Sequence, residues 1–325
     1  MKFYKFIGNE KIREQLTYLT ESGRMPHAIM LAGANGLGKH TLAREIALSL
    51  FCRGEEKPCL SCPQCSKVIK GIHPDIYEYT APDRANAFHV NKVREIIEDA
   101  YVTPNEADYK IYILGNAQSM NISAQNALLK LLEEPPSYAV FILCVTNKSA
   151  MLETVLSRSV VINVEAVECS EGAEYITREN EDISYDEAKS ALEIWGGNIG
   201  VALDSLSDGK LRKISDAANE LALNVIADNE YELLKTCSKF VWNNAMLSSA
   251  LSLLKTIFRD ALLIDSPSVS GRRETAERLA SRLSREKLIR LCEACDSLRF
   301  MADRNANNSI LITKVSSDLR RAIGR

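Results

Sequence analysis

The pattern of apolar and polar positions changes near residue 165. Before that point, short apolar runs alternate with segments whose apolar residues recur every three or four positions. The runs predict strands at 28–32, 76–79, 110–114, 140–145 and 160–164, and the periodic segments predict helices at 9–22, 41–51, 66–70, 89–101, 123–132 and 151–156. Alternating strands and helices form a parallel sheet with helices on both faces. We therefore expect an α/β domain over residues 1–165.

Beyond residue 165 the pattern is helical alone. Three short amphipathic segments, at 171–179, 185–195 and 201–206, predict a small helical lid at 166–208. Long amphipathic helices then predict a third, all-α domain at 209–325, interrupted by a polar loop at 265–271. Three domains are in keeping with a length of 325 residues.

A glycine-rich loop follows the first predicted strand and leads into a helix. It contains Gly33, Gly36 and Gly38, followed by Lys39, His40 and Thr41. In this context the loop amides form a nest for phosphate, and the lysine reaches a terminal phosphate. His40 stands where a serine or threonine usually binds magnesium. Thr41 cannot take that role, because one step along a helix rotates a side chain by about 100°.

The strand at 110–114 lacks the acid that would complete an ATPase site. It is followed by Gly115 and Asn116, neither of which carries a charge. Hydrolysis needs a carboxylate in the magnesium shell and a group that orients the attacking water. We therefore expect no intrinsic ATPase activity. Two alternatives stay open for the loop: weak binding of ATP or ADP, or a tight turn without a ligand.

Charge and hydropathy narrow the classes of partner. No apolar run is long enough to span a bilayer, and the N-terminus has no signal-peptide pattern, so we expect a cytoplasmic protein without a membrane partner. The net charge of −3 argues against binding a polyanion by charge alone. From Lys255 onward the chain has 15 Lys/Arg against 9 Asp/Glu, which favours solvated helix faces over a DNA-binding patch.

Four of the nine cysteines lie within fourteen residues, in the spacing C-x6-C-x2-C-x2-C. They are Cys52, Cys59, Cys62 and Cys65. A reducing cytosol argues against disulfides, and clustered thiolates suit tetrahedral zinc. The spacing therefore predicts a structural Zn²⁺ site, with four free thiols as the alternative. We expect the other cysteines, Cys292 and Cys295 included, to be packing residues.

Several motifs resemble those of bacterial clamp-loader subunits of the AAA+ class. The most specific is AQNALLKLLEEPP at 124–136; the others are Arg24-Met25-Pro26-His27-Ala28, His73-Pro74-Asp75, Ser157-Arg158-Ser159 and the cysteine cluster after the loop helix. Weaker signals lie at 197–203 and 305–307. The resemblance implies an AAA+ P-loop domain with a parallel sheet, a helical lid, and an all-α C-terminal collar through which subunits assemble.

Within that family, the departures at His40, Gly115 and Asn116 resemble the delta-prime type, which tends to have lost the motor chemistry. Gly200 agrees, because motor subunits hold a phosphate-sensing arginine at the matching position. Thr146-Asn147 resembles the residue that senses the γ-phosphate in motor subunits, with a strand-ending turn as the alternative.

The resemblance also implies a role for Arg158. In the family this arginine is a finger that enters the ATP site of the neighbouring subunit and stabilises charge on the transferred phosphoryl group. Ser159 replaces the cysteine of the family motif. The alternative is an arginine that caps its own helix.

The implied function is that of a delta-prime-like subunit of the DNA polymerase III clamp loader. Such a chain is a non-hydrolysing stator that acts during loading of the sliding clamp on primed DNA. The implied partners are the gamma or tau and delta subunits, the clamp, and primer-template DNA contacted through the assembly. An ATP-hydrolysing gamma/tau-type motor and a non-replicative AAA+ regulator remain as alternatives.

Overall fold

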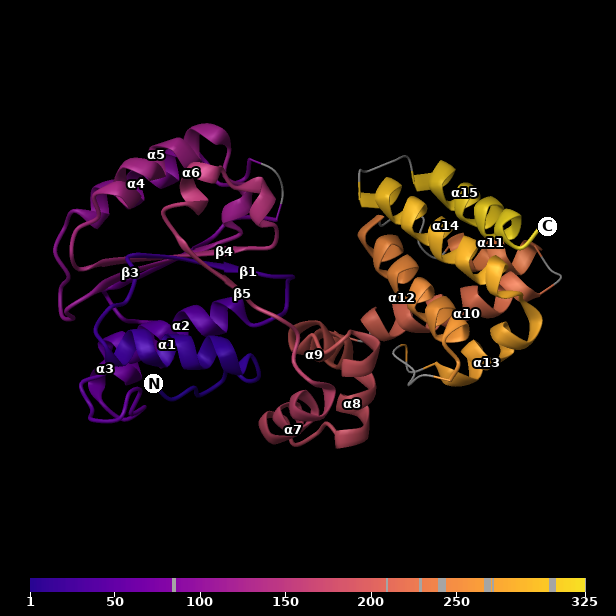
Figure 1. Ribbon diagram of the computed structural model, residues 1–325, viewed down its shortest axis with the longest axis horizontal. Helices are drawn as coiled ribbons and strands as arrows, with labels where there is room; N and C mark the ends of the chain where they lie inside the picture. Colours follow the sequence, from indigo (N-terminus) through magenta and orange to yellow (C-terminus); the bar gives the residue numbers. More distant parts are fainter. Residues whose placement is uncertain are drawn as a thin grey trace. The chain divides into compact units, whose positions relative to one another are not determined.

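The computed structural model in Figure 1 describes residues 1–83, 86–208, 210–227, 230–238, 244–265, 270, 272–303 and 308–324. The chain divides into two units, Met1–Glu171 and Gly172–Arg325. The first carries the sheet and both glycine- and cysteine-rich motifs. The further division of the second unit into lid and collar stays a prediction.

One five-stranded parallel sheet organises the first unit, as the sequence predicts. Its strands are β1 (Ala28–Ala32), β2 (Ile76–Thr80), β3 (Lys110–Gly115), β4 (Ala139–Val145) and β5 (Val160–Asn163), in the spatial order β2-β3-β4-β1-β5. Every side chain of β1, β3 and β4 is buried, which explains why these strands read as continuous apolar runs.

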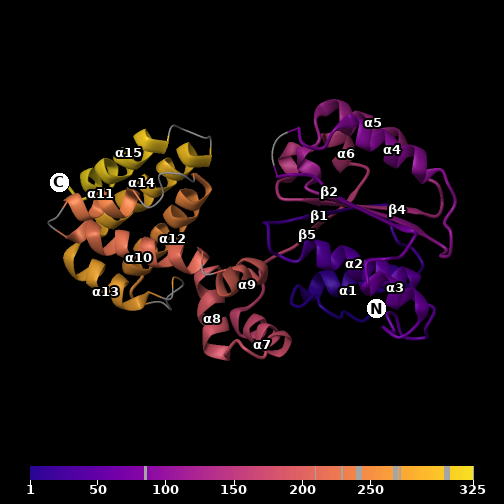
Figure 2. The ribbon, with the colours of Figure 1, turned by 180° about the vertical axis from the view of Figure 1, so that it is seen from behind.

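Helices cover both faces of this sheet (Figures 1 and 2). One face carries α1 (Glu10–Glu21), α2 (Lys39–Phe51) and α3 (Pro63–Ile69), and the other carries α4 (Val90–Ala100), α5 (Ile122–Glu133) and α6 (Glu153–Leu156). The sheet residues divide between two cores by alternation: Ile29 and Leu31 face α1–α3, whereas Met30 faces α4–α6. This is the period of two that a strand imposes.

Within residues 1–165, three helices begin two or three residues away from the predicted start. Helix α2 begins at Lys39, directly after Gly38, so that the loop lysine lies in the first helical turn. Helix α3 begins at Pro63, because the Cys62 thiol accepts a hydrogen bond from the backbone N–H of Cys65 and caps the helix. The predicted helix at 151–156 is shorter, with α6 over Glu153–Leu156 and a 3₁₀ turn at Lys148–Ala150 before it.

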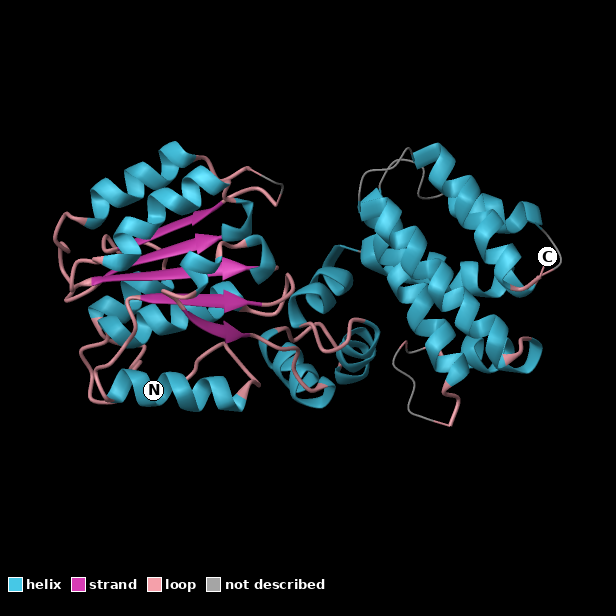
Figure 3. Cartoon of the chain, turned by 45° about the horizontal axis from the view of Figure 1, so that its top comes forward, coloured by secondary structure: helices cyan, strands magenta, loops and turns pink. Residues whose placement is uncertain are grey.

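The regular elements described in the second unit are all helices, as Figure 3 shows. They are α7 (Cys169–Glu179, which begins in the first unit), α8 (Tyr185–Ile194), α9 (Ile199–Asp208), α10 (Lys210–Ile226), α11 (Glu230–Ser238), α12 (Asn244–Leu262), α13 (Arg273–Arg282), α14 (Arg285–Asp303) and α15 (Asn308–Ala322). Helices α10–α15 share one apolar core that includes Leu221, Phe258 and Leu291. Most of the loop predicted at 265–271 lies outside the described residues. No helix in the described ranges is both long and apolar enough to cross a membrane.

Candidate functional site

The glycine loop connects the carboxyl end of β1 to the amino end of α2. Gly38 precedes the helix with φ 83°, a left-handed conformation that favours glycine. The Lys39 ammonium does not point to solvent. It donates to the backbone carbonyls of Gly33 and Ala34, at 2.7 Å each, and the residue is only 7% exposed. Burial lowers the pKa of Lys39. The backbone carbonyls of the loop therefore accept hydrogen bonds from the Lys39 ammonium. These bonds would have to break before the ammonium could contact a phosphate.

His40 fills the space in which a strand-end carboxylate would lie. A Cβ atom added to Gly115 would be 2.6 Å from His40 Cε1 and 2.7 Å from Nε2, so the imidazole packs on the bare glycine backbone. On its other side, His40 Nδ1 lies 3.6 Å from Glu78 Oε1, and Arg44 pairs with the same carboxylate at 2.9 Å. The two departures from an ATPase sequence thus form one packed contact.

Thr41 and Asn116 supply no substitute for the missing metal ligands. Thr41 lines a small pocket with Tyr4, Arg44 and Leu48, which agrees with the rotation expected one step along the helix. Asn116 has φ 53°, and its side-chain amide donates to the carbonyl of Ala81 at 2.8 Å.

A polar network that sequence reasoning missed crosses the carboxyl edge of the sheet. Asp83 accepts hydrogen bonds from Asn35 of the glycine loop at 3.1 Å and from Gln118 at 3.3 Å. Gln118 in turn accepts from the backbone N–H of Thr146 at 3.2 Å. Asn147 caps the 3₁₀ turn, accepting from the backbone N–H of Ser149 at 3.0 Å. Thr146-Asn147 therefore matches the strand-ending turn, and Asp83 places negative charge beside the loop.

Arg158 lies at the opposite edge of the sheet from its own glycine loop. It precedes β5, whose first residue, Val160, pairs with Ile29 near the start of β1. The loop follows the end of β1, a strand of five residues, or about 13 Å at 3.3 Å per residue. Arg158 and the glycine loop therefore lie at opposite ends of the strands of the sheet.

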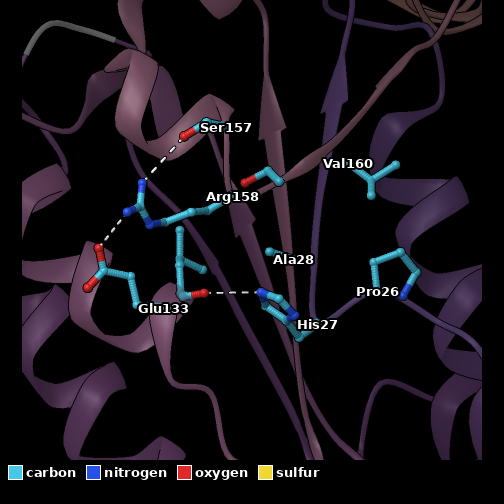
Figure 4. Close-up of a pocket in the computed structure, with 9 residues that line it drawn as sticks. Pro26, His27, Ala28, Glu133, Ser157, Arg158 and Val160 are labelled. Atoms are coloured by element: carbon cyan, nitrogen blue, oxygen red, sulfur yellow. Dashed lines mark hydrogen bonds and ion pairs between the residues drawn. The ribbon is translucent and has the colours of Figure 1, made fainter.

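Arg158 lines a pocket of about 440 Å³ (Figure 4). Nη2 lies 2.7 Å from Glu133 Oε1, and Nη1 donates to the carbonyl of Thr154 at 3.0 Å and to Ser157 Oγ at 3.4 Å. His27 also lines the pocket, with Nε2 3.1 Å from the carbonyl of Leu132. The bond to the Thr154 carbonyl is the one expected if Arg158 caps its own helix, α6. The bond to Glu133 is not part of such a cap, because Glu133 lies at the end of α5.

The four clustered cysteines converge as their spacing predicts. The sulfurs of Cys52, Cys59, Cys62 and Cys65 all lie within 4.8 Å of one another. Four sulfurs placed 2.3 Å from a zinc ion in a tetrahedron are separated by about 3.8 Å, a spacing within the limit that these four sulfurs show. Successive backbone N–H groups point at these sulfurs: Cys59 N lies 3.2 Å from Cys52 Sγ, and Cys62 N lies 3.4 Å from Cys59 Sγ.

Backbone N–H groups favour the thiolate form of Cys59 and Cys62. Hydrogen bonds from the backbone of Ser61 and Cys62 lower the pKa of Cys59 to about 6. Burial acts to raise the pKa of Cys62, but bonds from the backbone of Cys65 and Arg53 outweigh it and the pKa is lowered. Burial raises the pKa of Cys65. The donor set, sulfur separation and N–H···S bonds fit a metal that binds thiolates.

His73 and Asp75, noted in the sequence as a motif, tie the cysteine cluster to the sheet. The His73 ring stacks on Phe51 at 4.2 Å and lies 2.6 Å from Gln64 Oε1. Asp75 is fully buried and accepts from the backbone of Asn105 at 2.5 Å. Their roles in the structure are those of buried connectors.

In the second unit, several basic residues of the segment from Lys255 onward have acidic partners. Arg272 pairs with Asp216 at 2.6 Å, Arg273 with Glu277 at 3.1 Å, and Arg321 with Asp318 at 3.4 Å. These pairs agree with solvated helix faces. Gly200 lies in the first turn of α9, Cys292 and Cys295 belong to the helical core as expected, and residues 305–307 lie outside the described ranges.

The first unit is similar to replication proteins. Residues 8–168 match the family described as "DNA polymerase III, delta subunit". The chain is 37% identical over 158 residues to DNA polymerase III subunit gamma of Buchnera aphidicola subsp. Schizaphis graminum, covering 48% of this chain and 43% of that protein. It is 31% identical over 159 residues to subunit tau of Bacillus subtilis, covering 48% of this chain and 28% of that protein.

Among solved structures, a DNA polymerase III gamma subunit-related protein from Thermotoga maritima aligns over 95% of this chain and 99% of its own, at 19% identity and a TM-score of 0.47. The chain spans half or less of the length of the curated relatives that it matches. The family match and the names of these relatives support a clamp-loader AAA+ relationship for the first unit.

Proposed function

We propose that this chain is a clamp-loader subunit of the delta-prime type. It does not hydrolyse ATP itself, and it donates Arg158 to the ATP site of a neighbouring gamma- or tau-type subunit while the sliding clamp is loaded on primed DNA. The lid at 166–208 and the collar at 209–325 assemble it with gamma or tau and delta. The family match over residues 8–168 supports the assembly, and the geometry of the first unit supports the division of labour.

The observation that carries the proposal is the packing of His40 on Gly115. Hydrolysis requires a hydroxyl and a carboxylate that hold magnesium against the phosphates. Here the imidazole occupies the volume that such a carboxylate would need, since even a methyl group on Gly115 would lie 2.6 Å from the ring. A single reversion at either position leaves the other obstacle in place. The chain is therefore a poor ATPase for steric as well as chemical reasons.

Arg158 supplies chemistry that the loop does not. A guanidinium is permanently charged and presents a planar set of donors, which suits it to a phosphoryl group whose oxygens gain charge during transfer. Its place at the amino edge of β5, away from the glycine loop, supports action on a second subunit.

We also propose that Cys52, Cys59, Cys62 and Cys65 bind a structural Zn²⁺. A bound ion would cross-link the segment between α2 and α3 and contribute to folding. The ligands are shared between a loop and the start of α3, so this role is structural rather than catalytic.

The names of the curated relatives favour a second candidate, an ATP-hydrolysing motor of the gamma/tau type. The two candidates differ in what the purified chain does with Mg²⁺-ATP. The stator predicts no turnover above that of a Lys39→Ala control. Turnover that is lost in Lys39→Ala would favour the motor.

A further inference from the structure

The Arg158 guanidinium is accessible, yet both of its terminal nitrogens are engaged by its own chain. Its side chain is 35% exposed and that of Glu133 is 48% exposed. Both terminal nitrogens have partners: the Glu133 carboxylate at 2.7 Å for Nη2, and the Thr154 carbonyl at 3.0 Å for Nη1. Figure 4 shows Glu133 and Ser157 on either side of the guanidinium. The arginine must leave these partners before it can contact a phosphate elsewhere.

Glu133 is the partner whose position is set independently of Arg158. It is the last residue of α5, which ends before Pro135 and Pro136 because proline cannot continue the helix. Thr154 and Ser157, by contrast, belong to α6 and the turn that carry Arg158 itself. The ion pair therefore links two separate elements.

Building on the proposed arginine finger, we propose that Glu133 is a positioning residue that holds Arg158 in a withdrawn state and is exchanged for the neighbour's phosphate. Each arrangement pairs the guanidinium with one anionic group. Partly exposed ion pairs are weak, so the more highly charged triphosphate can displace the carboxylate. The Glu133–Arg158 ion pair thus keeps the arginine away from the neighbouring site in the absence of ATP. Once the arginine contacts the phosphate, the ion pair is broken and does not affect the reaction.

This role predicts a separation of KM from kcat. In Glu133→Gln the withdrawn state is weakened, so the KM of the neighbour's ATPase for Mg²⁺-ATP falls about two- to five-fold, while kcat is unchanged. Glu134→Gln is the matched control, because it makes the same change in charge one residue along. The measurement uses the complex assembled with gamma- or tau-type and delta-type subunits from the same organism.

Two results would overturn the proposed role of Glu133 and leave the arginine finger intact. One is a KM in Glu133→Gln equal to that of Glu134→Gln, and the other is a fall in kcat, which would make Glu133 a residue that orients the arginine for reaction. In both cases Arg158→Ala still lowers kcat, so the finger survives. If Arg158→Ala leaves kcat unchanged, both the arginine finger and the proposed role of Glu133 are wrong.

A second experiment tests the contact in the full chain without partners. The rate at which phenylglyoxal modifies Arg158 is measured by peptide mass spectrometry in wild type, Glu133→Gln and Glu134→Gln. We expect modification to be at least about two-fold faster in Glu133→Gln alone, and the difference to shrink in high salt, where ion pairs are screened. Equal rates in all three proteins would overturn the proposal.

Discussion

Replacing Gly115 by alanine tests whether His40 and Gly115 form one packed unit. The added methyl carbon would lie 2.4 Å from Thr80 Oγ1, 2.6 Å from His40 Cε1 and 2.7 Å from His40 Nε2, well inside the 3.5–4.0 Å of an ordinary contact. The His40 side chain is 38% exposed and can move aside, whereas Thr80 is β-branched and stiff at χ1. Overpacking of this kind costs about 1–3 kcal/mol, and we expect about 2 kcal/mol here.

The assay is native-state hydrogen exchange of the buried amides of β3, which reports opening of the first unit separately from the second. The four proteins are wild type, Gly115→Ala, His40→Ala and the double variant. Removing the imidazole should recover about 0.5–1 kcal/mol of the loss, with the Thr80 contact accounting for the rest. A loss below about 0.5 kcal/mol in Gly115→Ala, or the same loss in the His40→Ala background, would refute the packing argument.

Two further predictions concern the cysteine cluster and its connectors. Cys65→Ser should reduce bound zinc well below stoichiometry, measured by metal analysis, and lower the melting temperature, measured by calorimetry. The control Cys169→Ser should retain the metal. Unchanged zinc in Cys65→Ser would contradict the site. Burial lowers the pKa of His73 in the folded chain, so the unfolded chain binds a proton first as pH falls through about 6.5. Stability should then decline by up to about 1.4 kcal/mol per pH unit until the pH reaches the lower pKa of the folded chain. A denaturation series in pH should show a shallower decline in His73→Asn, and equal slopes would refute this.

Local patterns were sufficient to predict the elements of the first unit. Apolar runs located all five strands within one or two residues, because β1, β3 and β4 are buried on both faces. The cysteine spacing also predicted convergence of the four sulfurs, since all four lie in one short segment.

The contacts on which the proposed function rests could not be predicted in the same way. His40 and Gly115 are far apart in the sequence, and so are Glu133 and Arg158; only the parallel sheet and its helices bring each pair together. The sequence indicated that His40 and Gly115 both depart from an ATPase sequence. It did not indicate that the His40 imidazole occupies the space that a side chain at position 115 would need. Nor could it indicate that Lys39 would turn back onto the carbonyls of its own loop.

The central claim is that this chain supplies an arginine to a neighbour and does not use its own loop. The most direct test is DNA-stimulated ATP hydrolysis by the assembled complex, containing either Arg158→Ala or Lys39→Ala in this chain. An arginine finger contributes about 10³–10⁵ in rate at the site that it enters, so we predict that Arg158→Ala removes that site's share of turnover and Lys39→Ala leaves turnover unchanged. Loss of turnover in Lys39→Ala with full activity in Arg158→Ala would contradict the account.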